Sequence, residues 1–334
     1  MKTPPPSPLR WLAMSALLTI TTLTASSAAA KGSPQDLVSY LPASSRVVMG
    51  GDAVRSRGTA AFDEAMKLLR ERGADALKLM DEQLGFRIER DLYAGVLGLP
   101  ASRNGKPSSK TFTMVLQGKI NADLYKKNVL NQPKAKKRQV GKLTVIDGGK
   151  NSEVALINES TVVIARGSKK YRDSVWKVAQ GQGKSASKDG TIRGLLKGVN
   201  GKSHAWVVAN MARVKQSEQA PQLRTIVANM DLSAGLKLRS LVSMKSEEDA
   251  TRASKTMEES RLKAKLMMMV YGADALIDNL KVSQAKSALT INTSMNEDQL
   301  RRMAQALKAP KRANPPKPSG SAPKAQPEDK PKAP

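Results

Sequence analysis

The side chains that most often carry enzyme chemistry are scarce in this sequence. It contains no cysteine and a single histidine, His204. A cysteine nucleophile and a zinc site built from several histidines are therefore impossible, and a Ser-His-Asp triad would have to use His204. There is also no G-x-S-x-G turn, in which many hydrolases carry their serine. His204 precedes Trp206 at the start of a predicted strand, where we expect a surface or edge position. The sequence predicts a protein that is not an enzyme.

Two stretches resemble phosphate-binding loops. GQGKS at 181–185 resembles the end of a Walker loop, but the full pattern requires glycine at the position that Val178 occupies. This stretch also follows a predicted helix, whereas a Walker loop follows a strand. The second stretch is RVVMGGDAVRSRG at 46–58, in which an apolar run meets Gly50 and Gly51. We expect no nucleotide, metal or other cofactor.

The role of the glycine pair becomes clearer when 46–58 is aligned with AWVVANMARVK at 205–215. Asp52 then falls on Asn210, whereas Gly50 and Gly51 fall on Val208 and Ala209, so no glycine pair is shared. We therefore expect Gly50 and Gly51 to let a neighbouring segment pack closely against a strand. Asp52 and Asn210 are expected to end their strands with turns capped by the side chain.

Basic residues are the most prominent feature of the composition. The chain has a formal net charge of +27, which favours polyanionic partners such as lipopolysaccharide, anionic glycan or an acidic membrane surface. Only 3% of the residues are aromatic, so nucleic acid is expected to bind only non-specifically. A basic surface that only keeps the protein soluble is the alternative. The candidate polyanion-binding residues lie on a predicted loop and in the C-terminal tail: Lys134, Lys136, Lys137, Arg138, Lys142, Lys311 and Arg312.

The first thirty residues have the pattern of a secretory signal. Lys2 and Arg10 precede the apolar run Trp11–Ala25, and small residues end at Ala30. Cleavage there would lower the net charge from +27 to +25 and leave no predicted transmembrane segment. An uncleaved anchor is the alternative. Because no cysteine follows the apolar run, we do not expect a lipoprotein, and we expect export to the periplasm or the medium.

The remaining pattern predicts an α+β protein of two related halves, each an antiparallel sheet covered by helices. The expected divisions are a signal peptide at 1–30, an N-terminal half at 31–199, a shorter C-terminal half at 200–309 and a disordered Pro-rich tail at 310–334. Aligned segments suggest an internal duplication: 112–129 with 238–255, and 160–178 with 287–305. Ser246–Asp249 and Asn296–Gln299 have the pattern of helix capping boxes.

Other functions remain open. The run Met267–Met269 is expected to pack in the core or between the halves, but it could also line an apolar groove that carries a lipid. An enzyme of unfamiliar type would use lysine, serine or carboxylate side chains. A module that binds another envelope protein would use strand addition or the tail. The leading hypothesis is a non-enzymatic envelope protein that binds or scaffolds through its basic surface and tail.

The start of the predicted mature chain resembles a group of uncharacterised exported proteins of Gram-negative bacteria such as myxobacteria. The resemblance rests on YLPASSRVVMGGDAVRS and LGFRIERDLYAGVLGLP, in particular on Leu41-Pro42-Ala43, Asp52 and Gly85-Phe86. Arg87-Ile88 replaces an Asp-Pro pair that follows the phenylalanine in the group. The likeness covers about a third of the predicted mature chain and implies export and a shared fold, without a known activity.

Overall fold

A computed structural model describes residues 33–101, 110–125, 127–128, 136–212, 214, 216 and 220–308. Within them the strands are β1 (Ser45–Asp52), β2 (Leu92–Pro100), β3 (Phe112–Gly118), β4 (Lys137–Val140), β5 (Leu143–Gly149), β6 (Ser152–Asn158), β7 (Thr161–Arg166), β8 (Ala205–Asn210), β9 (Leu223–Asp231), β10 (Leu236–Met244), β11 (Lys281–Ala285) and β12 (Ala288–Met295). The helices are η1 (Asp36–Tyr40), α2 (Ala53–Ser56), α3 (Ala60–Leu84), α4 (Ile88–Asp91), α5 (Ala122–Tyr125), α6 (Lys169–Ala179), η3 (Ala186–Lys188), α7 (Gly190–Leu196), α8 (Glu247–Glu259), α9 (Arg261–Met269), α10 (Ala275–Asp278) and α11 (Glu297–Lys308).

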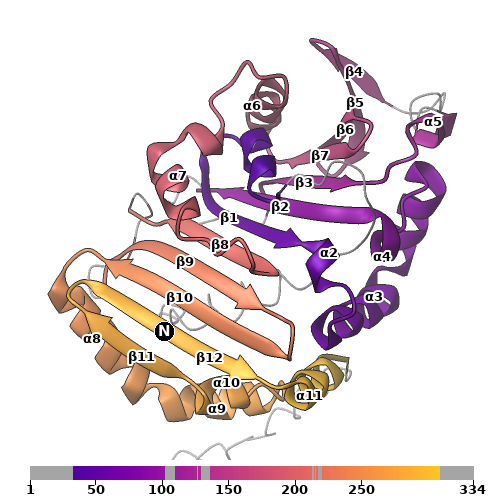
Figure 1. The fold of residues 1–334 in the computed structure, drawn as a ribbon. Helices are drawn as coiled ribbons and strands as arrows, with labels where there is room; N and C mark the ends of the chain where they lie inside the picture. Colours follow the sequence, from indigo (N-terminus) through magenta and orange to yellow (C-terminus); the bar gives the residue numbers. More distant parts are fainter. Residues whose placement is uncertain are drawn as a thin grey trace, which may run out of the picture.

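All of these strands belong to one antiparallel sheet (Figure 1). Its order is β11-β12-β10-β9-β8-β1-β2-β3-β7-β6-β5-β4. The predicted α+β class with antiparallel strands is confirmed. The sequence predicted a separate sheet in each half, whereas the structure joins the two sets of strands, because β1 pairs with β8.

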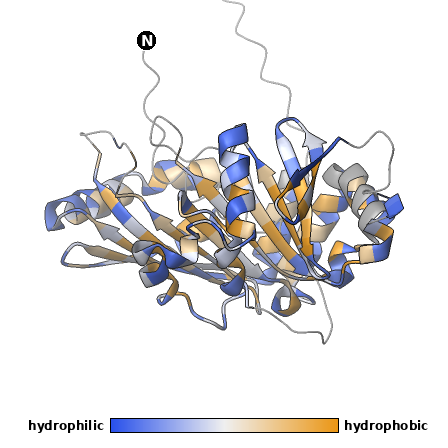
Figure 2. Ribbon diagram, turned by 90° about the horizontal axis from the view of Figure 1, so that it is seen from above, coloured by the Kyte–Doolittle hydropathy of each residue, from blue (hydrophilic) through white to orange (hydrophobic). Residues whose placement is uncertain are grey.

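Hydrophobic residues lie mainly along the strands (Figure 2). Both faces of the sheet bury hydrophobic side chains. On one face, a core that includes Met49, Val207 and Met230 also takes in residues of α10 and α11. On the other face, a second core includes Val48, Val208 and residues of η1, α6, η3 and α7. A smaller cluster holds α8 against β10 and β12.

The pairing of β1 with β8 places Gly50 directly opposite Trp206. A Cβ atom on Gly50 would lie 2.2 Å from Cζ2 of the Trp206 indole, far inside the contact distance of two carbon atoms. Trp206 is 2% exposed, so its ring has little room to move away. This confirms the expectation that a glycine here allows close packing of a neighbour.

The strand ends are capped as expected. The Asp52 carboxylate accepts a hydrogen bond from the Arg55 backbone N–H at 3.0 Å and caps α2. The amide oxygen of Asn210 accepts one from the Ala212 N–H at 3.3 Å. These bonds satisfy backbone donors that would otherwise lack a partner where the strand pairing ends.

The predicted capping box at Asn296–Gln299 is confirmed in full, and the one at Ser246–Asp249 is confirmed in part. Ser246 Oγ accepts from the Asp249 N–H at 3.1 Å at the start of α8. At the start of α11 the bonds are reciprocal, since Asn296 and Gln299 each accept from the other's backbone N–H at 2.9 Å. Such caps fix where the helices begin.

Helices also cross the predicted boundary between the halves. α11 packs against α3, and α7 packs on β8 and β9. Leu300 and Met303 of α11 share a core cluster with Ala61 of α3. The sheet and its helical layers are therefore continuous across residues 198–201.

Replacing Gly50 by alanine tests the contact with Trp206. We expect Gly50→Ala to lower the free energy of unfolding by about 3 kcal/mol, because the added methyl group overlaps a buried ring. Urea denaturation measures the change. The matched control is Gly194→Ala in α7, where an added Cβ meets nothing within 4 Å and should be neutral or slightly stabilising. Equal stability of Gly50→Ala and the wild type would contradict the packing described here.

Candidate functional site

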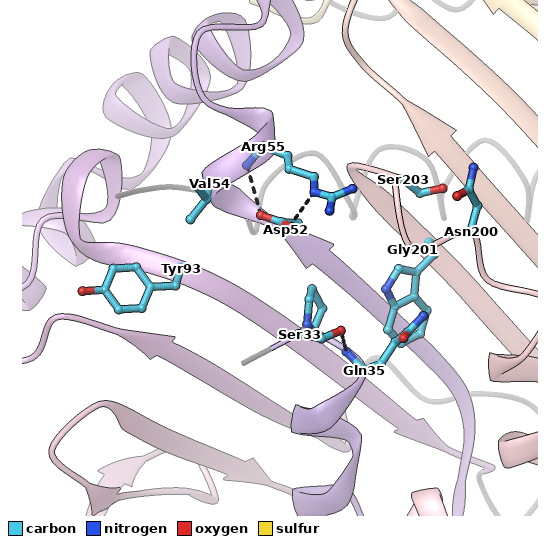
Figure 3. A pocket seen from close by; sticks show the side chains of 11 residues that line it. Ser33, Gln35, Asp52, Val54, Arg55, Tyr93, Asn200, Gly201 and Ser203 are labelled. Atoms are coloured by element: carbon cyan, nitrogen blue, oxygen red, sulfur yellow. Dashed lines mark hydrogen bonds and ion pairs between the residues drawn. The ribbon is translucent and has the colours of Figure 1, made fainter. Parts of the chain in front are cut away.

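A polar cavity of about 460 Å³ lies where β1 and β8 meet (Figure 3). Asp52 lines it from the end of β1, and Arg55 lines it from α2. Asn200 and Ser203 line it from the segment before β8. Arg55 is bound to Asp52, with its Nε 3.1 Å from Oδ2. The described lining holds serine hydroxyls but no histidine or lysine that could take a proton from them. The cavity can hold a small polar molecule.

His204 lies near this cavity but is 9% exposed, so the expected surface or edge position is wrong. Its Nδ1 accepts a hydrogen bond from the Leu232 backbone N–H at 3.2 Å and lies 3.3 Å from Asp231 Oδ1. Burial lowers the pKa of His204, and the Asp231 carboxylate opposes this only in part. A neutral imidazole that accepts from Leu232 joins the start of β8 to the end of β9.

The predicted basic loop is partly a strand. Lys137 and Arg138 lie in β4, which pairs with β5 at the edge of the sheet, so their placement on a loop is wrong. Lys136 and Lys142 are exposed beside β4 and in the turn that follows it. The other predicted residues, Lys134, Lys311 and Arg312, lie outside the described residues.

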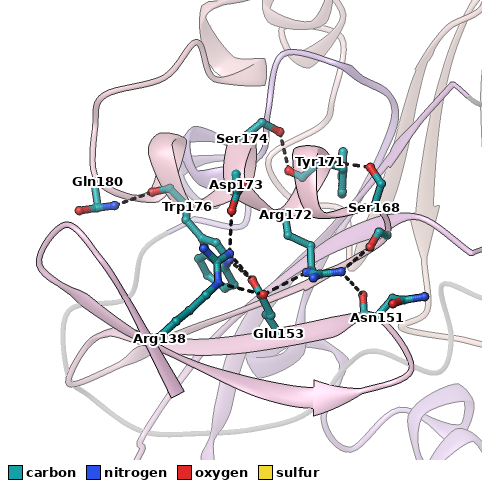
Figure 4. A network of polar contacts seen from close by, with 11 residues as sticks. Arg138, Asn151, Glu153, Ser168, Tyr171, Arg172, Asp173, Ser174, Trp176 and Gln180 are labelled. Atoms are coloured by element: carbon teal, nitrogen blue, oxygen red, sulfur yellow. Dashed lines mark hydrogen bonds and ion pairs between the residues drawn. The ribbon is translucent and has the colours of Figure 1, made fainter. Parts of the chain in front are cut away.

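Arg138 is engaged within the protein (Figure 4). Its guanidinium donates to both oxygens of Glu153, at 3.0 and 2.7 Å, and to Asp173 at 2.7 Å. Trp176 Nε1 also donates to Glu153, at 2.6 Å, and Arg172 Nε lies 3.1 Å from it. Arg138 therefore links β4 to both β6 and α6. Its positive charge is already compensated by the carboxylates of Glu153 and Asp173.

The electrostatics of Glu153 follow from these contacts. Burial by itself raises the pKa of Glu153, but hydrogen bonds from Arg138 and Trp176 outweigh burial and hold the pKa below its usual value. Glu153 is 7% exposed and remains ionised at neutral pH. Sequence reasoning missed this network because its members are far apart along the chain.

The sequence analysis also missed a basic surface on the open face of β10, β12 and β11. Val242, Met244, Leu289 and Ile291 point to the helical side, so their strand neighbours point the other way. No helix lies in front of this part of the sheet in Figure 1. We call these outward side chains the open sheet face: Lys237, Arg239, Leu241, Ser243, Thr290, Asn292, Ser294, Lys281, Ser283 and Ala285.

The open sheet face carries positive charge without internal compensation. Arg239 is opposite Asn292, which is opposite Lys281, so the three share one row across the strands. β10, β11 and β12 contain three basic and no acidic residues, namely Lys237, Arg239 and Lys281. All three are exposed. The acidic residue next to them is Asp231 on β9, which is directly opposite Lys237. Among the described residues, no carboxylate oxygen lies within 4 Å of Arg239 or Lys281.

The methionine run departs from the expectation of core packing. Met268 packs against the core, but Met267 and Met269 are 44% and 55% exposed. Neither the cavity at β1 nor a second one of about 570 Å³ between α8 and β11 is lined by Met267–Met269. Met267 and Met269 belong to an exposed apolar surface on α9.

The described part of the chain lacks two further features that would point to a function. In the ranges given above, no three histidine, aspartate or glutamate side chains gather as ligands of one metal ion. None of the described helices is long and apolar enough to cross a membrane.

Comparisons with known proteins do not identify a family. No family model matches the chain. No curated protein matches it either. Among solved structures it is similar to crystal form I of TP0453, with a TM-score of 0.49 and 9% identity, covering 83% of this chain and 98% of that chain. Crystal forms III and IV of TP0453 give TM-scores of 0.47 and 0.46, with 11% and 9% identity, and each covers 81% of this chain and 96% of that chain.

Replacing Glu153 by glutamine tests the role of the network. We expect Glu153→Gln to lower the free energy of unfolding at pH 7 by about 2–3 kcal/mol, because Arg138 and Arg172 lose a buried partner. The control is Glu259→Gln, whose 3.8 Å ion pair with Lys255 is exposed and should contribute less than about 0.5 kcal/mol.

The same pair of variants has a defined pH dependence. Since the folded pKa of Glu153 is lowered, its stabilisation is complete above the ordinary pKa and is lost as the pH falls through the folded pKa. The stability difference between wild type and Glu153→Gln should therefore shrink on acidification. A difference that stays constant from pH 7 to pH 3 would contradict the ionised network.

Proposed function

We propose that this protein is exported, is not an enzyme, and binds an anionic polymer of the cell envelope through its basic surface. The observation that carries the proposal is the open sheet face, where Arg239 and Lys281 are exposed without a described carboxylate within 4 Å. Buried or paired basic residues such as Arg138 cannot serve this role, because their charge is already compensated.

The geometry of the open sheet face suits an extended polymer better than a small ligand. Adjacent strands lie about 4.8 Å apart, so Arg239 and Lys281 are separated by about 10 Å across the row. Thr290 and Ser283 add hydroxyl groups in the next row, where they can hydrogen-bond to phosphate or sulfate oxygens. Lys245 and Lys286 are exposed at the end of these strands and extend the positive surface.

The partner class follows from charge and composition. Lipopolysaccharide and anionic glycan carry repeated negative groups, and binding to them releases condensed counterions. Another envelope protein with an acidic surface is a further partner of the same kind. The scarcity of aromatic residues favours only non-specific contact with nucleic acid. The signal pattern of residues 1–30 supports export, and the pairing of Asp52 with Arg55 supports a non-catalytic role for the central cavity.

We also propose that the two halves arose by duplication. Outward from the β1–β8 pair, one side runs β2, β3, β7, β6 and the other runs β9, β10, β12, β11. In both series the outermost of the four strands comes before its inner neighbour in the sequence: β6 precedes β7, and β11 precedes β12. This equivalence supports the alignment of 112–129 with 238–255 and of 160–178 with 287–305.

Neutralising the open sheet face should weaken polyanion binding in a salt-dependent manner. We expect the double variant Arg239→Gln/Lys281→Gln to lose about tenfold or more in affinity for lipopolysaccharide and anionic glycan at low salt. With duplex DNA as a defined polyanion, the slope of log affinity against log salt should decrease by about 2, because each lost phosphate contact removes about 0.9. Fluorescence anisotropy across a salt series measures both quantities.

The control is Lys170→Gln/Lys177→Gln on α6, which removes the same charge from another exposed surface. It should leave the affinity within about threefold. Equal losses in both double variants would show that only total charge matters and would refute the open sheet face as the site. If the wild type binds none of the three polymers even at low salt, the proposed function is refuted.

A further inference from the structure

Large exposed apolar side chains gather on one short segment of this protein. Among the described residues, seven large hydrophobic side chains are exposed, and six of them lie between Leu262 and Tyr271. Their exposed fractions range from 44% at Met267 to 73% at Val270. We call this set the α9 patch: Leu262, Leu266, Met267, Met269, Val270 and Tyr271. The seventh, Leu241, stands alone on the open sheet face.

α9 differs from an ordinary surface helix because it carries large apolar side chains on the side that faces solvent. The residues that face the protein are partly buried and recur at helical spacing: Arg261, Ala264, Lys265 and Met268. On the outer side, Leu262, Leu266 and Met269 lie within about 60° of one another, since successive residues turn by about 100°. The apolar stripe therefore points to solvent, while two of the basic residues lie on the partly buried side of the helix.

The inward basic residues are held by specific bonds. Lys265 Nζ lies 2.7 Å from Asp278 Oδ1, and Arg261 donates to the Asp278 backbone oxygen at 3.3 Å. After α9, Gly272 takes a φ of 61°, and its N–H bonds to the Met269 oxygen. These contacts fix the orientation of α9, so the outward position of the apolar stripe is built into the fold.

Charge identifies the occupant. The segment 261–271 contains three basic and no acidic residues. With Arg261 and Lys265 engaged, Lys263 remains exposed beside the stripe, and Arg302 is exposed on α11, whose backbone Gly272 approaches. Pairing two copies of the patch would bring these like charges together in a chain of net charge +27. An anionic lipid surface complements both the apolar stripe and the charges.

We propose that α9 docks this protein on an anionic lipid bilayer, as an interfacial helix that lies in the plane of the membrane. Nine residues extend about 13.5 Å, far less than the thickness of the hydrocarbon layer. Leu262, Leu266 and Val270 enter the boundary between headgroups and acyl chains, and Lys263 reaches the lipid phosphates. This activity is independent of the open sheet face, which lies on the opposite side of the sheet.

Vesicle flotation with the full chain tests the proposal. The wild type should bind vesicles of phosphatidylcholine and phosphatidylglycerol in equal parts at least tenfold more tightly than vesicles of phosphatidylcholine alone. The triple variant Leu262→Ser/Leu266→Ser/Val270→Ser should lose at least tenfold in binding, with an unchanged far-UV spectrum because all three side chains are exposed. Leu241→Ser is the matched control and should bind as the wild type does.

Two more variants keep the outcomes distinct. Lys263→Glu should weaken binding to the mixed vesicles severalfold. The double variant Arg239→Gln/Lys281→Gln should retain vesicle binding. The triple serine variant should retain polyanion binding. Wild-type binding by the triple variant would overturn the proposal, and so would equal binding to the two kinds of vesicle. Wild-type dimers in light scattering that the triple variant abolishes would assign the patch to a second copy instead.

Discussion

The close approach of Gly50 to the indole of Trp206 is the contact on which the rest of the structure depends. It lets β1 and β8 pair directly and places residues of both halves in the same two cores. Without a side chain at position 50, the ring fills the space on the strand surface that a larger residue would occupy. The pair lies in the interior of the sheet, with β9, β10, β12 and β11 on one side and β2, β3, β7, β6, β5 and β4 on the other. The hydrogen bond from the Asp52 backbone N–H to the His204 carbonyl oxygen and the packing of α11 on α3 reinforce the same junction.

Local chemistry was predictable from the sequence, and long-range partners were not. Asp52, Asn210 and Asn296 could be assigned as caps because their partners lie two or three residues away. The partner of Arg138 lies fifteen residues away on another strand, so a dense run of basic residues gave no sign that one member was engaged. For Met267–Met269 the sequence did not indicate which of the three side chains the rest of the protein covers. The run was expected to pack in the core or between the halves, although only Met268 packs against the core.

The two proposed surfaces follow from how the helices are distributed. α6 and α7 cover one face of the sheet only near its centre and N-terminal side, which leaves β10, β12 and β11 open. On the other face α8, α9 and α10 cover the same strands, and α9 turns its apolar stripe outward. The basic surface and the apolar surface thus lie on opposite sides of the C-terminal strands. A protein with this arrangement would hold an anionic polymer on one side while resting on a lipid surface with the other.

Native-state hydrogen exchange tests most directly whether β1 and β8 join the protein into one sheet. If the account is correct, the slowest amides of β1 and β8 exchange only by global unfolding, with the free energy found by denaturant unfolding. Amides of β3 and β10, which lie equally far on either side, should then be no better protected. Faster exchange at β1 and β8 than at β3 and β10 would show that the halves separate while each stays folded, and would contradict the account.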